Sequence, residues 1–281
     1  MKTGAVRAIP LSLMYITNEP WVAQIAQASG VDRVFIDLEI RGKQERQGHL
    51  DTVISRHTLG DIEAVRCVLD TCELLIRVNP LHPGSAAEVE GVIAGGADVV
   101  MLPFFKTSAE VETFVHLVAA RARVCLLVET PEAVDAIDEI IAIDGIDEVH
   151  IGLNDLHLGY GMTFMFEPLA DGTVERLCRK FAARGLRYGF GGIARLGQGV
   201  LPAEMVITEH YRLGSQMAIL SRSFCDIRQL GSRDELEHLF ISGVEEIRAF
   251  ESDLRHADPV RLEDNRVRVA RIVAEVVKTH D

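Results

Sequence analysis

The stretch Val124-Cys125-Leu126-Leu127-Val128-Glu129-Thr130-Pro131 decides the fold of this chain of 281 residues. Its first five residues form an unbroken apolar run, which is typical of a parallel β-strand buried on both faces. The run ends in the acidic Glu129, and Thr130 and Pro131 follow as the expected N-cap and first residue of a helix. The stretch therefore predicts a strand-to-helix unit that carries an ionisable residue at the carboxyl end of its strand.

The same unit recurs along the chain, with strand starts spaced by roughly 29 residues. The predicted strands are Pro10–Met14, Arg33–Asp37, Leu74–Val78, Asp98–Leu102, Val124–Glu129, Glu148–Gly152, Arg187–Gly191 and Gln216–Leu220. Eight such units predict an α/β fold, the TIM (β/α)8 barrel, and a doubly wound open sheet is the alternative. No linker rich in Pro, Gly or Ser divides the chain, so we expect one barrel domain over residues 1–281.

Two amphipathic segments follow the eighth unit, at residues 233–256 and 265–278. The first can cover the barrel wall, whereas the second exceeds what eight units require. We therefore expect residues 258–281 to form a helical extension that could pack on a neighbouring subunit of a homo-oligomer.

Composition excludes several classes of function. The chain carries 29 Lys and Arg against 42 Asp and Glu, and a net charge of −13 argues against a nucleic-acid binder. No apolar run approaches the roughly 20 residues of a membrane-spanning helix, and the first residues do not resemble a signal peptide. The five cysteines are an odd number without metal-type spacing, which is typical of reduced thiols in a cytoplasmic protein.

Ionisable residues stand at four strand ends, where burial is costly unless they are paired or bind a metal. Glu129 and Asp155 follow neighbouring strands, and two carboxylates with several waters suit Mg²⁺, with Mn²⁺ as an alternative. Arg77 would offer a planar cationic fork to a carboxylate or an enolate. Asp37 and Glu39, at the end of the second strand, would support the site without binding the metal.

Each of these residues also has a purely structural interpretation. Glu129 could favour the start of the helix at Pro131, and Asp155 could be a capping residue. Arg77 could be an ion-pair partner of Asp37 or Glu39, a role compatible with a place in the same site. Their joint occurrence at one face of the predicted barrel favours a functional site.

The long segments between strands supply candidate catalytic bases and a second binding region. His49 and His57 lie in the segment after the second strand, and His157 follows Asp155 by two residues. Each could transfer a proton near neutral pH, although a packing role is the alternative. A further group of residues after the seventh strand could bind a phosphate or carboxylate of a second substrate, or could serve only tight packing. This group is Gly191, Gly192 and Arg195.

Five short motifs in order resemble the HpcH/HpaI aldolase and citrate lyase superfamily over roughly residues 10 to 225. They are Asp37-Leu38-Glu39, Arg77-Val78-Asn79, Gly96-Ala97-Asp98 with Met101-Leu102-Pro103-Phe104, Val128-Glu129-Thr130-Pro131-Glu132-Ala133 and Ile151-Gly152-Leu153-Asn154-Asp155-Leu156. The resemblance implies a TIM barrel that binds Mg²⁺ or Mn²⁺ and makes or breaks a carbon–carbon bond next to an enolate.

The resemblance also implies roles for single residues. Glu129 and Asp155 would bind the metal, and Arg77 would contact the substrate oxygens. Backbone amides of Leu153, Asn154 and Asp155 would hold the carboxylate of a 2-oxo acid. Family members commonly form trimers or hexamers with exchanged C-terminal helices, which would account for the extra helix.

This sequence departs from the family pattern after Glu39. The pyruvate-type class II aldolases carry a His at the next position and the citrate-lyase-like branch carries an Asp, whereas this chain has Ile40. The N-terminal coenzyme A signature of the latter branch is also missing from Pro10–Tyr15. The departures favour small free acids over coenzyme A thioesters, in an atypical member without the usual proton-transferring His.

These observations predict a metal-dependent carbon–carbon lyase of the aldolase type, which acts on a 2-oxo acid and releases or takes up an aldehyde. A loop His or a metal-bound hydroxide would accept the proton. The alternatives are a metal-dependent hydrolase or decarboxylase of a related acid or thioester, and a non-catalytic barrel that binds a metabolite.

Overall fold

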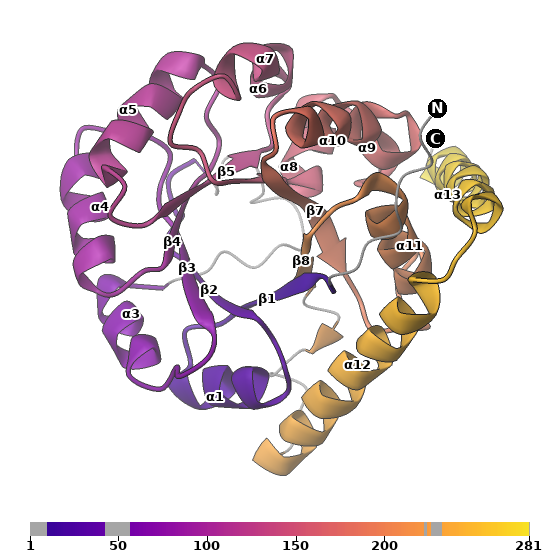
Figure 1. The fold of residues 1–281 in the computed structure, drawn as a ribbon, viewed down its shortest axis with the longest axis horizontal. Coiled ribbons are helices and arrows are strands. Elements are labelled where there is room, and N and C mark those ends of the chain that lie inside the picture. The colour runs from indigo at the N-terminus through magenta and orange to yellow at the C-terminus, as the bar shows by residue number, and fades with distance from the viewer. Residues whose placement is uncertain (1–9, 43–56, 222–223, 226–231, 281) are drawn as a thin grey trace.

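Eight parallel strands close into a barrel in the computed structural model, which describes residues 10–42, 57–221, 224–225 and 232–280 (Figure 1). The strands are β1 (Ser12–Ile16), β2 (Arg33–Asp37), β3 (Glu73–Arg77), β4 (Val99–Leu102), β5 (Arg123–Val128), β6 (Glu148–Ile151), β7 (Arg187–Ile193) and β8 (Met217–Leu220). Each strand pairs with the next in sequence, and β1 also pairs with β8. The closed order confirms the TIM barrel and excludes the open doubly wound sheet.

Helices follow the strands and surround the barrel. They are α1 (Pro20–Ala28), α3 (Leu59–Arg66), α4 (Ser85–Ala94), α5 (Ser108–Val118), α6 (Pro131–Asp135), α7 (Ile137–Ile140), α8 (Leu153–Gly159), α9 (Glu167–Ala170), α10 (Thr173–Ala183), α11 (Ala203–Leu213), α12 (Arg233–Leu254) and α13 (Pro259–His280). None of the helices in the described ranges combines the length and apolarity needed to cross a membrane. The N-cap prediction for α6 is confirmed, because the Thr130 side chain accepts a hydrogen bond from the Ala133 amide.

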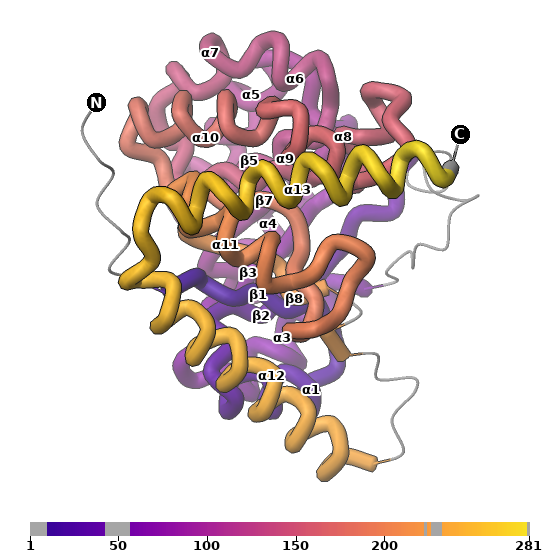
Figure 2. The backbone as a smooth tube through the Cα atoms, turned by 90° about the vertical axis from the view of Figure 1, so that its right-hand side faces the viewer, coloured from indigo at the N-terminus to yellow at the C-terminus, as the bar shows by residue number. Residues whose placement is uncertain are grey.

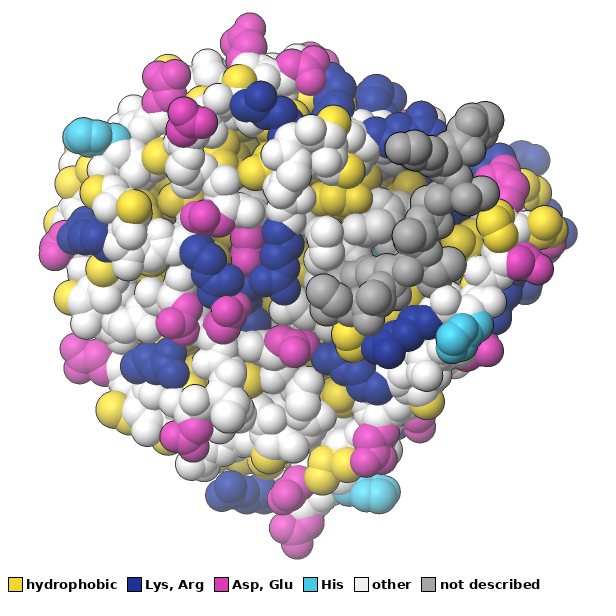
Figure 3. All heavy atoms as spheres, viewed as in Figure 1, with side chains coloured by type: hydrophobic (Ala, Val, Ile, Leu, Met, Phe, Trp, Pro, Cys, Tyr) yellow, Lys and Arg dark blue, Asp and Glu magenta, His cyan; other side chains and the backbone are white. Residues whose placement is uncertain are grey.

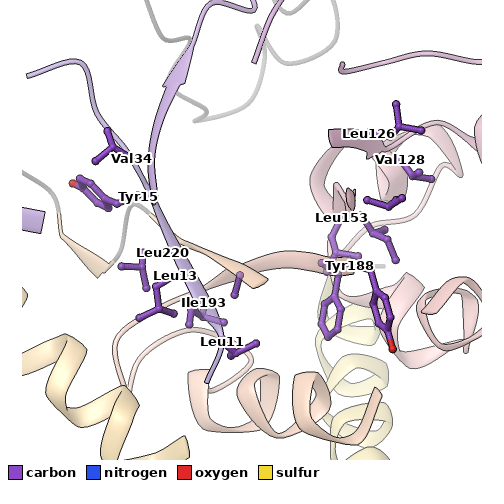
Figure 4. Close-up of a cluster of buried hydrophobic side chains, with 14 of the residues drawn as sticks. Leu11, Leu13, Tyr15, Val34, Leu126, Val128, Leu153, Tyr188, Ile193 and Leu220 are labelled. Atoms are coloured by element: carbon purple, nitrogen blue, oxygen red, sulfur yellow. The ribbon is translucent and has the colours of Figure 1, made fainter. Parts of the chain in front are cut away.

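Successive strand residues alternate between the inside of the barrel and the helices outside. The inward positions at mid-height form a small apolar cluster of Met14, Phe35, Leu75, Val99, Met101, Cys125, Leu127 and Met217. The outward positions and the helix faces form the larger core, part of which Figure 4 shows. The inward positions nearest the carboxyl ends of β2, β3 and β5 therefore belong to Asp37, Arg77 and Glu129.

A network of ion pairs fills the barrel at the amino ends of the strands. Arg33 is fully buried and donates to Glu148 on one side and to Glu73 on the other, with distances of 2.7 Å each. Arg123 and Arg187 also bond to Glu148. Figure 3, drawn from the same side as Figure 1, shows basic and acidic side chains next to one another near the centre of that face. These ion pairs thus hold together the amino ends of the strands inside the barrel.

The two C-terminal helices cover one side of the barrel (Figure 2). α12 packs beside α1, and α13 crosses α11 and α9 of its own chain. The Asn265 side chain of α13 is buried and donates to the Met205 carbonyl and to Glu209 Oε1, both in α11. The extra helix is confirmed, and its exchange between subunits stays a prediction.

Candidate active site

The carboxyl ends of β2 and β3 bring three charged side chains together. Asp37 and Arg77 are register partners on the paired strands, and both point into the barrel. The Arg77 Nε and Nη2 atoms each donate to one carboxylate oxygen of Asp37 at 2.8 Å. Glu39 Oε2 lies 3.4 Å from Arg77 Nε. The ion-pair interpretation of Arg77 is therefore correct, and Asp37 fixes the plane of its guanidinium.

The charge balance around Arg77 is strongly negative. Burial lowers the pKa of the Arg77 guanidinium, but nearby carboxylates outweigh burial and hold that pKa above its ordinary value. The carboxylates that act on it are those of Asp37, Glu39 and Glu129. Arg77 thus stays charged, and Glu129 lies near enough to influence it although the two residues are on different strands.

Glu129 directly follows β5 and is 2% exposed. Its Oε1 accepts a hydrogen bond from the Phe104 amide at 3.1 Å, and Phe104 adopts a left-handed backbone with a φ of 50°. A Cβ atom on Gly152 would lie 2.7 Å from Glu129 Oε2. The carboxylate is therefore fitted between a strained amide donor after β4 and a glycine after β6.

Asp155 lies in the first turn of α8 and is 8% exposed. Residues 152, 155 and 159 share one face of this turn because they are spaced by three and four positions. Gly152 contacts Glu129, and a Cβ on Gly159 would lie 2.6 Å from Pro131, two residues after Glu129. This face of α8 is thus turned toward the end of β5, which places Asp155 on the same side as Glu129.

The donor set fits a divalent cation that prefers oxygen ligands. Glu129 and Asp155 offer carboxylate oxygens, and the missing side chain at Gly152 leaves room beside Glu129 Oε2. Within the described ranges, no three His, Cys, Asp or Glu side chains gather as a metal-ligand group. Mg²⁺ keeps several of its waters when it binds to a protein, so two carboxylates are enough side-chain ligands for it. The same two ligands suit Mn²⁺.

Asn79 is a site residue to which the sequence analysis gave no role. Its Oδ1 accepts hydrogen bonds from the amides of Ile40 and Arg41 at 3.0 Å each, and its Nδ2 donates to Glu88 at 2.7 Å. Asn79 thereby fixes the chain directly after Glu39. An amide side chain two residues after a strand-end Arg was the available signal, but its partners lie on other elements and could not be predicted.

The three candidate histidines have different surroundings. His57 Nδ1 accepts a hydrogen bond from the Asp37 amide at 3.0 Å, which places His57 at the end of β2. His157 is buried, and its Nδ1 lies 3.2 Å from the Leu153 carbonyl in the same helix. That bond turns His157 toward the Leu153 face of α8, away from the Asp155 face. His49 lies outside the described residues.

Gly191 and Gly192, which were expected after the seventh strand, lie within β7 because the strand continues to Ile193, and only Arg195 follows it. Gly191 has a φ of 53°, and a Cβ there would lie 2.8 Å from the Leu153 side chain, so this glycine serves close packing. Gly192 lies where the register of β7 with β8 shifts. Arg195 Nη2 lies 3.5 Å from the Ser242 hydroxyl of α12. A role of these residues in binding a second substrate stays a prediction.

The amides of Leu153 and Asn154 open α8, whose N-cap is Gly152. A glycine has no side chain to accept hydrogen bonds from the first amides of a helix. Their predicted contact with a substrate carboxylate also stays a prediction.

A closed barrel with carboxylates and a fixed arginine at the carboxyl ends of its strands defines the class: a TIM barrel with an acidic site in the usual place for activity. The family model that matches residues 11–165 is that of HpcH/HpaI aldolase/citrate lyase. The chain belongs to this family.

Individual relatives agree with this family. The chain is 27% identical over 208 residues to a 4-hydroxy-2-oxovalerate aldolase of Novosphingobium aromaticivorans. The matched region covers 63% of this chain and 74% of the relative. The chain is 25% identical over 227 residues to a 4-hydroxy-4-methyl-2-oxoglutarate aldolase of Chaetomium globosum, with 68% and 78% covered. The crystal structure of an HpcH/HpaI aldolase from Desulfitobacterium hafniense has the same fold, with a TM-score of 0.60 at 18% identity and coverage of 85% of this chain and 93% of that one.

Proposed function

We propose that the protein is a divalent-metal-dependent carbon–carbon lyase of the aldolase type, which acts on a small 2-oxo acid. The observation that carries the proposal is the position of Arg77, fixed by Asp37 and influenced by Glu129 at the carboxyl end of the barrel. The relatives named above are aldolases of hydroxylated 2-oxo acids, which supports the reaction class.

In this proposal Glu129 and Asp155 hold the metal. The bound Mg²⁺ or Mn²⁺ would act as a Lewis acid toward the 2-oxo group. Arg77 binds the oxygen that becomes negative when the carbon–carbon bond breaks and the enolate forms. Its Nε and Nη2 already bond to Asp37, so Nη1 is the nitrogen best placed to donate to the substrate. Because Asp37 fixes the guanidinium in advance, little reorganisation is needed during the reaction.

The test is exchange of the methyl protons of pyruvate for deuterium in the presence of Mg²⁺ or Mn²⁺. We expect exchange with the unaltered protein, and a loss of at least about 10²-fold in Glu129→Gln. Glu132→Gln is the matched control, because Glu132 is an exposed acid three residues further on that pairs with Lys106. The absence of exchange with every 2-oxo acid tried would contradict the aldolase chemistry.

Decarboxylation of a 2-oxo diacid is a second candidate function, favoured by Ile40. This residue is 57% exposed and occupies the position after Glu39 where the pyruvate-type aldolases have a His. Loss of carbon dioxide leaves the same enolate but requires no acceptor for a hydroxyl proton. Product analysis distinguishes the two reactions, since only the aldolase releases an aldehyde.

We also propose that the small-molecule substrates are a 2-oxo acid and an aldehyde. The protein would assemble as a homo-oligomer, either a trimer or a hexamer. The mass of the protein in solution would decide the assembly.

A further inference from the structure

His57 occupies a position at the edge of β2 where a neighbouring strand would otherwise supply a partner. The last ladder pair of β1 with β2 joins Ile16 to Phe35, so β1 ends before Asp37 is reached. The amide of Leu38, directly after β2, donates to the Arg77 carbonyl on β3. Because amides along a strand point alternately to its two sides, the Asp37 amide points toward β1. The acceptor it finds there is His57 Nδ1, at 3.0 Å.

This hydrogen bond fixes the protonation of the His57 ring. A backbone amide can only donate, so Nδ1 must present its lone pair and the ring proton must lie on Nε2. A second proton on Nδ1 would face the Asp37 amide, with two donors at a separation of 3.0 Å. Neither nitrogen can therefore accept a proton while the bond to Asp37 persists.

The contacts continue from His57 to the proposed substrate group. His57 holds the main chain of Asp37, and the Asp37 carboxylate holds Nε and Nη2 of Arg77 at 2.8 Å. Asp37 is 2% exposed, so a shift of its main chain would move a carboxylate with little free space around it. The orientation of Arg77 thus depends on His57 through two successive interactions.

We propose that His57 is a neutral positioning residue that holds the end of β2 and, through Asp37, the guanidinium of Arg77, and that it is not the proton acceptor of the reaction. This inference rests on the proposed function and changes the role expected from the sequence. It leaves the hydroxyl proton to another group, such as a water molecule.

Three substitutions of His57 separate the two roles. The Asn side chain places its Oδ1 close to the position of Nδ1 and can accept the Asp37 amide, but it does not titrate. The Gln side chain reaches the position of Nε2 instead, and Ala reaches neither. A positioning role predicts that His57→Asn keeps kcat/KM within about threefold, whereas His57→Gln and His57→Ala lose roughly tenfold, mainly through a higher KM.

A general base would behave differently. Its removal would lower kcat by roughly 10²–10⁴-fold in all three variants, including His57→Asn. That result, or equal losses in His57→Asn and His57→Ala, would overturn the proposal. The assay is metal-dependent exchange of pyruvate methyl protons, measured at several substrate concentrations to separate kcat from KM.

A second measurement does not depend on activity. Hydrogen exchange of the Asp37 amide should be slow in the unaltered protein and in His57→Asn, and faster in His57→Gln and His57→Ala. Equal protection in all four proteins would contradict the role of His57, whatever the reaction is. If the four proteins show this pattern of amide protection but the unaltered protein exchanges the methyl protons of no 2-oxo acid, the proposed function fails. The structural role of His57 stands in that case.

Discussion

At the scale of single residues, Gly152 fits closely against Glu129. We expect Gly152→Ala to displace the Glu129 carboxylate, because the new Cβ would lie 2.7 Å from Oε2 and 2.9 Å from the Glu129 Cβ. The variant should bind Mn²⁺ at least about tenfold more weakly than the unaltered protein. Its rate of exchange of pyruvate methyl protons should fall by a similar factor. Calorimetric titration with Mn²⁺ measures the first effect.

Gly60→Ala is the matched control for this substitution. Among the residues that the structure describes, the atom nearest to a Cβ on Gly60, at the start of α3, would be the Thr58 hydroxyl at 3.7 Å. Metal binding in this control should equal that of the unaltered protein. Unchanged Mn²⁺ binding in Gly152→Ala would show that the carboxylate of Glu129 is not a ligand.

His150 gives the protein a specific sensitivity to acid. The side chain is fully buried on β6, Nε2 lies 3.1 Å from the Gly191 carbonyl, and Nδ1 has no partner among the described residues. Burial lowers the pKa of His150 from 6.5 to about 4. Since the unfolded chain then binds the proton more tightly, the stability that His150 contributes is complete above pH 6.5 and is lost as the pH falls toward 4.

The corresponding change in the free energy of unfolding is about 3 kcal/mol. Urea unfolding between about pH 7 and pH 4.5 should show about 2 kcal/mol of this loss in the unaltered protein and much less of it in His150→Phe. The exposed His116 of α5 provides the control, and His116→Gln should keep the loss. An identical pH dependence in His150→Phe would contradict the assignment.

Some of the site residues could be predicted from the sequence and others could not. Arg77, Glu129 and Asp155 stand out because each interrupts or follows an apolar strand, and the barrel brings strand ends together. The left-handed backbone of Phe104 and the hydrogen bond between the Asp37 amide and His57 depend on contacts between segments that are far apart in the sequence. Sequence spacing carries no signal for such contacts.

At the scale of elements, the docking of α13 rests on a narrow apolar face. Val269 is 1% exposed and Val267, two residues earlier in the same helix, is 54% exposed. We expect Val269→Ala to lower the free energy of unfolding by roughly 1–3 kcal/mol, because it removes buried methyl groups. Val267→Ala should change it by less than about 0.5 kcal/mol. Urea unfolding measures both, and equal effects would show that α13 does not rest on its own barrel in solution.

The eight predicted strands were correct in number and order, and their limits differ for physical reasons. The first strand runs over Ser12–Ile16 instead of Pro10–Met14, because a strand buried on both faces is apolar throughout and its sequence does not mark its ends. The long segment between β6 and β7 contains the short helices α8 and α9, which the sequence pattern does not predict. α9 has only four residues, too few for a helical period to be recognised.

At the scale of the whole molecule, the excess of acid at one end of the barrel predicts stabilisation by a divalent cation. Three carboxylates, those of Asp37, Glu39 and Glu129, act on the single guanidinium of Arg77 there, so a bound Mg²⁺ or Mn²⁺ would relieve mutual repulsion. After treatment with a chelator, Mn²⁺ at about 100 times its Kd should raise Tm by roughly 5–10 °C. The increase should be absent in Glu129→Gln and present in Glu132→Gln. An equal increase in both variants would place the cation elsewhere.

The layered interior of the barrel has a consequence for the uptake of a proton. On β3, Glu73 belongs to the ion-pair network, Leu75 to the apolar cluster and Arg77 to the site. The apolar cluster lies between the two charged ends, and the buried imidazole of His150 lies in the same layer, because His150 is the register partner of Leu127. Uptake of a proton by His150 would therefore introduce a charge between the two ends, within the influence of both Arg33 and Arg77.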